Sequence, residues 1–201
     1  MSKSFLGVLA LSLVAAATAA SPALAQTEQS SRVAGTVERV EGDNLVVKSA
    51  GSEKTVHLAS NATIFALVKT TLADVKPGVF VGVGATPQPD GTQRAIRVVI
   101  FPESMRGLGE GHRPWDRPGT TMTNATVDNA VTSVDGQMLT VKYKGGEKKI
   151  AIGADALIAT YVTADRAQLA KGASVSVTGV VAADGVLDAR RVVIDRTIAK
   201  G

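Results

Sequence analysis

The chain has 201 residues, of which 45% are hydrophobic and only 3% aromatic, and it contains no cysteine. The missing cysteine excludes disulfide bonds, thiolate metal sites and cysteine nucleophiles. The formal net charge of +4 is small for a protein that must neutralise several phosphates, and the basic residues are spread along the chain, so we expect no nucleic acid partner.

The first 25 residues have the parts of an export signal. Lys3 is their only charged residue, residues 5–20 form an apolar run, and Ala23-Leu24-Ala25 places small residues before a cleavage position. The run is too short for a stable span of about 20 residues, although a short membrane anchor is the alternative. We therefore expect a cleavable signal peptide at 1–25, no membrane span, and a flexible polar lead-in at 26–32.

Residues 33–101 predict five short strands. Runs of alternating apolar residues are separated by turns such as Gly42-Asp43-Asn44 and Pro89-Asp90-Gly91. After the third strand, residues 70–75 predict one helical turn, which Pro77 and Gly78 end. This order of elements is typical of a small barrel of the OB type.

Residues 124–196 repeat the same order, and the closest local match is Ala95–Ile100 (AIRVVI) with Ala189–Ile194 (ARRVVI). The sequence therefore predicts an all-β protein with two tandem five-stranded OB-like Greek-key barrels, one per repeat. Each barrel is expected to have a short helical turn between its third and fourth strands, and residues 197–201 a tail. An immunoglobulin-like sandwich is the competing fold, but it requires about seven strands per unit.

The connector between the repeats, residues 102–123, has neither a strand nor a helix pattern. It holds the only tryptophan, Trp115, and its charges alternate in sign. Phe101, Met105 and Leu108 add apolar groups that can be buried, unlike the residues of a flexible linker. We expect an ordered connector packed against both barrels, with Trp115 filling the seam between them. The alternative is that Trp115 stacks on a ligand or binds a partner.

The segment Phe101–Asp116, FPESMRGLGEGHRPWD, and the sequence TMTNATV at 121–127 resemble a family of exported proteobacterial proteins built from OB-like domains of unknown function. The resemblance covers nearly the whole chain after residue 25. It implies an export signal and β-barrel repeats, and it implies no established activity.

Four connector residues are candidates for contact with a partner: Arg106, His112, Arg113 and Trp115. No Ser-His-Asp or paired-carboxylate pattern stands out, so we expect neither an enzyme nor a bound cofactor. The sequence favours a non-catalytic periplasmic binding or interaction module, a monomer or weak oligomer. Its expected partner is a protein, a peptide or an envelope polymer, because OB-type barrels bind varied ligands and the fold alone selects none.

The alternative function is divalent-metal binding in the connector. His112 lies close in sequence to Glu110 and Asp116, and imidazole nitrogen and carboxylate oxygen are common metal ligands. The competing interpretation is that these acids, together with Glu103, pair with the nearby arginines and fasten the connector to the barrels.

Overall fold

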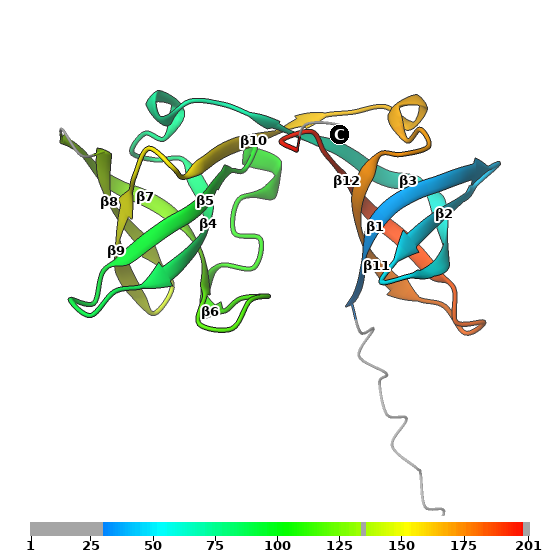
Figure 1. Ribbon diagram of the computed structural model, residues 1–201, viewed down its shortest axis with the longest axis horizontal. Coiled ribbons are helices and arrows are strands. Elements are labelled where there is room, and N and C mark those ends of the chain that lie inside the picture. The colour runs from blue at the N-terminus through cyan, green and yellow to red at the C-terminus, as the bar shows by residue number, and fades with distance from the viewer. Residues whose placement is uncertain (1–29, 134–135, 199–201) are drawn as a thin grey trace, which may run out of the picture.

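A computed structural model describes residues 30–133 and 136–198, so the expected signal peptide lies outside the described residues. Within these ranges the protein is all-β, and its helical residues form three single 3-10 turns. All twelve strands belong to one hydrogen-bonded sheet, which curls into two barrels (Figure 1). The described residues contain no helix that is long and apolar enough to span a membrane.

The first barrel is a closed ring of five strands. Four contacts between neighbours are antiparallel, and a parallel contact between β3 (Ser52–Lys69) and β12 (Leu187–Asp195) closes the ring. Its core is aliphatic, and Val37, Val56 and Val192 are fully buried in it. The strands in ring order are β1 (Ser30–Glu41), β2 (Asn44–Ser49), β3 (Ser52–Lys69), β12 (Leu187–Asp195) and β11 (Ser174–Val181).

The second barrel closes in the same way, with a parallel contact between β5 and β9. Val81, Leu139 and Ile150 lie fully buried in its core. The strands in ring order are β7 (Thr121–Ser133), β8 (Gly136–Tyr143), β9 (Gly146–Ile152), β5 (Gln93–Ile100) and β4 (Phe80–Pro87).

Each barrel therefore combines three strands of one sequence repeat with two strands of the other. The expectation that 33–101 and 124–196 each close a barrel of their own is wrong, because the first three strands of each repeat pair with the last two strands of the other. The physical reason lies in β3. It continues for 18 residues without a reversing turn and carries the chain from the first barrel to the second.

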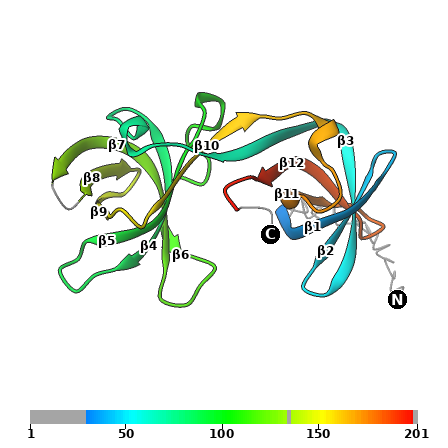
Figure 2. The same cartoon turned by 45° about the horizontal axis from the view of Figure 1, so that its top comes forward.

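A two-stranded bridge joins the barrels. The end of β3 pairs antiparallel with β10 (Leu157–Thr163), and Leu67 lies opposite Tyr161 (Figure 2). The sequence spacing that relates Arg97 to Arg191 also relates Leu67 to Tyr161. An approximate twofold axis therefore passes through the Leu67–Tyr161 pair and exchanges the two barrels.

Single helical turns follow the bridge strands. They are η1 (Leu72–Asp74) in the first repeat and η3 (Arg166–Gln168) in the second. The Asp74 carboxylate accepts hydrogen bonds from the Thr70 and Thr71 hydroxyls and from the Thr71 backbone, which hold the pKa of Asp74 below its usual value. This capping box defines where η1 begins.

Two boundaries differ from the sequence analysis. Residues 30–32 of the expected flexible lead-in belong to β1, and residues 121–123 of the expected connector belong to β7. The connector also contains secondary structure that its sequence does not predict, namely η2 (Glu103–Met105) and β6 (Gly111–Pro114). β6 forms because it pairs with the exposed edge of β7, a partner that local sequence cannot reveal.

Candidate binding cleft between the two barrels

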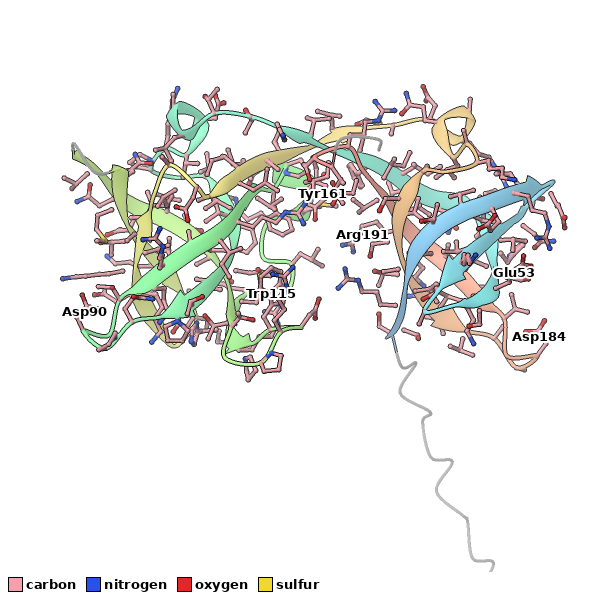
Figure 3. The ribbon with its side chains drawn as sticks, viewed as in Figure 1. Glu53, Asp90, Trp115, Tyr161, Asp184 and Arg191 are labelled. Atoms are coloured by element: carbon pink, nitrogen blue, oxygen red, sulfur yellow. The ribbon has the colours of Figure 1, made fainter. Side chains whose placement is uncertain are left out.

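A cleft with a volume of about 500 Å³ lies between the barrels. The outward faces of β1, β11 and β12 line one side, and those of β4, β5 and β7, with part of the connector, line the other. Leu67 and Tyr161 of the bridge also line it. Figure 3 shows Trp115, Tyr161 and Arg191 directed toward this space from three different parts of the chain.

Two glycines of β4 leave space for the aromatic rings of Trp115 and Phe101 on one wall of the cleft. A Cβ atom on Gly84 would lie 2.3 Å from Cζ3 of Trp115, and one on Gly82 would lie 2.7 Å from Cε2 of Phe101. Real atoms do not approach this closely, so both rings need glycine beneath them. Trp115 is only half-buried and lines the cleft. It does not fill the seam between the barrels, as the sequence analysis expected, because the cleft remains open beside it.

The opposite wall is polar. Ser174, Ser176 and Thr178 present their hydroxyl groups from β11, and Arg32 lies beside them on β1. Arg32 donates a hydrogen bond of 2.8 Å to Ser176 Oγ and forms an exposed ion pair of 3.3 Å with Asp116 of the connector. Within residues 30–133 and 136–198, the Ser174 and Thr178 hydroxyls make no hydrogen bond.

Two arginines at equivalent positions of the repeats line the cleft and differ in their partners. Arg97 on β5 forms a half-buried ion pair of 3.1 Å with Asp195 on β12. Burial alone would raise the pKa of Asp195, but hydrogen bonds from Thr197 and Arg97 outweigh burial and lower it. The Arg191 guanidinium forms no hydrogen bond or ion pair with any described residue. The repeat spacing explains this, because Phe101 occupies the position equivalent to Asp195.

Tyr161 lines the cleft together with these arginines. Its ring packs against Phe65 and Phe101, with centroid distances of 6.1 and 5.4 Å. Burial raises the pKa of the Tyr161 hydroxyl, while the positive charges of Arg97, Arg191 and Arg32, which line the same cleft, act in the opposite direction. The hydroxyl makes no hydrogen bond to the described part of the chain.

Of the four expected binding residues, Arg113 and Trp115 line the cleft, and Arg106 and His112 do not. Arg106 pairs with Glu103 at 2.6 Å and donates to the Gly78 carbonyl, so it fastens the connector to the second barrel. The same pairing raises the pKa of Arg106 and lowers that of Glu103. His112 Nδ1 lies 2.8 Å from the buried Thr123 hydroxyl, and burial followed by the charge of Lys148 lowers the pKa of His112.

The expected metal ligands are not brought together. Glu110 accepts a hydrogen bond from the Lys144 backbone, whereas Asp116 pairs with Arg32 of the first barrel. In the part of the chain that the structure describes, no group of three or more histidine, aspartate or glutamate side chains is arranged to hold a metal ion. These contacts hold the connector in place, but within the described part of the chain only Glu103 of its acids pairs with a nearby arginine, Arg106, so the competing interpretation is met in part.

The connector is ordered, but its contacts are unequal. Asn124 of β7 donates to the Leu108 carbonyl, and Arg113 donates to the Gly109 carbonyl, so the loop lies on the second barrel. The exposed pair between Arg32 and Asp116 joins it to the first barrel. The expectation of close packing against both barrels therefore overstates its contact with the first.

Sequence reasoning missed the strand residues of the cleft, above all Tyr161 and Arg191. Two signals were present in the sequence. The match of AIRVVI with ARRVVI places Arg97 and Arg191 at equivalent positions of the repeats. Directly after this match, the second repeat has Asp195 where the first repeat has Phe101. Neither signal predicts a cleft by itself, because the sequence does not show that the bridge brings the two barrel faces together.

Comparison with known proteins agrees with the doubled architecture. A model of a domain of unknown function, DUF5666, matches the chain twice, at residues 34–99 and 130–193. No curated protein and no solved structure matches the chain. With two barrels, two repeats and a match to both, the chain belongs to the family of proteins that contain the DUF5666 domain of unknown function.

Proposed function

We propose that this protein is a non-catalytic binding module of the bacterial periplasm that holds part of an envelope polymer, peptide or protein in the cleft between its barrels. The observation that carries the proposal is the cleft itself, with an indole on one wall and an arginine without a protein partner, among the described residues, on the other. A volume of about 500 Å³ is within the range of ligand sites.

We further propose that both barrels are of the OB type. In each ring the first, second and third strands of one repeat are followed by the fifth and fourth of the other, and the third and fifth strands are parallel. OB-type barrels commonly bind oligonucleotides and oligosaccharides through their faces and loops. Nucleic acid is the less suitable ligand here, because stacking of successive bases requires several exposed aromatic rings and the chain is 3% aromatic.

Export supports the periplasmic location, since Lys3, the apolar run and Ala23-Leu24-Ala25 together form a cleavable signal. We expect the protein recovered from the periplasm of a Gram-negative host to begin at Gln26. Mass spectrometry of the intact protein measures this, and a protein that keeps Lys3 and remains with the membrane fraction would contradict it.

The binding role can be tested through Trp115, because it is the only tryptophan and lines the cleft. Wild-type protein is titrated separately with size-fractionated envelope polysaccharide and with peptides from a digested periplasmic extract, and indole emission is recorded. We expect a saturable change with one fraction.

Thr178→Phe narrows the cleft from the opposite wall and should abolish the change, whereas Thr163→Phe, at an exposed position outside the cleft, should preserve it. If neither fraction changes the emission, or if both variants respond like the wild type, the cleft is not the binding site.

A further inference from the structure

The approximate twofold symmetry of the backbone does not extend to the side chains that line the cleft. Gly82 and Gly84 on β4 are replaced at the equivalent positions of β11 by Ser176 and Thr178. One barrel face therefore accepts aromatic rings, and the other presents hydroxyl groups toward them across the cleft. The two barrels therefore have similar backbones, but one lines the cleft with aromatic rings and the other lines it with hydroxyl groups.

The same comparison explains the charge at the inner end of the cleft. Arg97 is neutralised by Asp195, but the position where symmetry would place an acid for Arg191 is occupied by Phe101. The cleft is lined by four arginines, namely Arg32, Arg97, Arg113 and Arg191, and by two acids, Asp116 and Asp195. A guanidinium without a carboxylate partner favours an anion, and its planar fork matches the paired oxygens of a carboxylate or a phosphate.

We propose that the cleft binds an acidic saccharide, whose carboxylate is held by Arg191 and the Tyr161 hydroxyl while a sugar ring lies against Trp115. The inference rests on the proposed binding role of the cleft. The carboxylate accepts hydrogen bonds from the guanidinium and from the phenol, both of which lack partners among the described residues. Arg32 also lines the cleft, where it pairs with Asp116.

The walls favour a saccharide over an acidic peptide. Sugar rings combine an apolar face with hydroxyl groups around their edge, and the cleft offers an indole on one wall and the hydroxyls of Ser174 and Thr178 on the other. An extended peptide would instead require separate apolar pockets for alternate side chains.

Calorimetry with defined probes tests the proposal on the chain that begins at Gln26. The probes are trigalacturonate, the uncharged galactotriose, and a peptide of three glutamates. We expect trigalacturonate to bind at least about tenfold more tightly than either of the others, since hydrogen bonds to charged groups contribute most to affinity. Its affinity should fall with added salt, because exposed charges are screened.

Two variants test the assigned contacts. Arg191→Gln should weaken trigalacturonate binding by about ten- to a hundredfold, and Tyr161→Phe, which removes only a hydroxyl, by about three- to tenfold. Arg190→Gln is the matched control, because it removes the same charge one residue away at a position that does not line the cleft.

Equal binding of galactotriose, unchanged affinity in Arg191→Gln, or no binding of trigalacturonate overturns the proposal. Tighter binding of the glutamate peptide overturns it in favour of an acidic peptide. The proposed binding role of the cleft is refuted by a different result, namely that neither envelope polysaccharide nor periplasmic peptides alter Trp115 emission.

Discussion

Gly84 shows how a single missing side chain shapes the cleft. The six-membered ring of Trp115 occupies the space where a Cβ atom would be, with three ring atoms within 2.8 Å of that position. The backbone of Gly84 is ordinary strand, so the glycine is needed for space and not for an unusual backbone angle. The equivalent position of the other barrel is occupied by Thr178.

Gly84→Ala should therefore displace Trp115 and destabilise the protein by about 1–3 kcal/mol, the usual cost of overpacking. Thermal unfolding measures the loss, and a shift of indole emission reports the displacement. Gly146→Ala is the control, because its new methyl group would meet only the end of the Tyr143 side chain, at 3.2 Å. Equal melting temperatures and emission spectra for the wild type and Gly84→Ala would contradict the assigned packing.

At the scale of the elements, the bridge of β3 and β10 is the feature on which both barrels depend. The two bridge strands pair with each other. In addition, β3 pairs with β12, the last strand of the second repeat, and β10 pairs with β5, the last strand of the first repeat. A small apolar cluster of Leu67, Val99 and Ala159 is buried there, apart from the two barrel cores. Contacts in the bridge therefore stabilise the two barrels at the same time.

Leu67→Ala should lower stability by about 2–5 kcal/mol, because it removes a buried side chain and leaves a cavity. We expect one cooperative unfolding transition at a lower temperature, observed equally by Trp115 fluorescence and by far-UV circular dichroism. Val162→Ala, on β10 but exposed, should change stability by less than about 0.5 kcal/mol. Two separate transitions in Leu67→Ala would show that the barrels unfold independently.

At the scale of the whole molecule, the repeats exchange strands, so neither barrel is formed by one repeat of the sequence alone. The barrel cores mix residues of both repeats, such as Val37 with Val177 and Val81 with Val141. Cutting the connector leaves these cores and all the strand pairs between repeats intact.

We therefore expect that cleavage of a protease site inserted between the exposed residues Pro118 and Gly119 leaves a single particle. The two fragments should elute together from a size-exclusion column in native buffer and separate only in denaturant. Native elution as two folded halves would mean that each repeat closes its own barrel.

The sequence by itself determined the elements whose causes are local. Alternating apolar residues and the turns at Gly42 and Gly91 predicted the strands, and both turn glycines have the positive φ angles that favour this residue. The repeat predicted two equivalent units, and the connector was recognised as ordered. Arg113 and Trp115 were found because a lone tryptophan beside basic residues is conspicuous in an aromatic-poor chain.

The tertiary structure alone decided which strands share a barrel and therefore where the cleft lies. Alternation of apolar residues specifies which face of a strand is buried, but equivalent strands of two similar repeats present nearly the same face, so the pattern cannot select the partner. The length of β3 makes that choice by carrying the chain across to the other barrel. Arg191 and Tyr161 gain their place in the cleft from this crossing, because the opposing walls belong to strands far apart in the sequence.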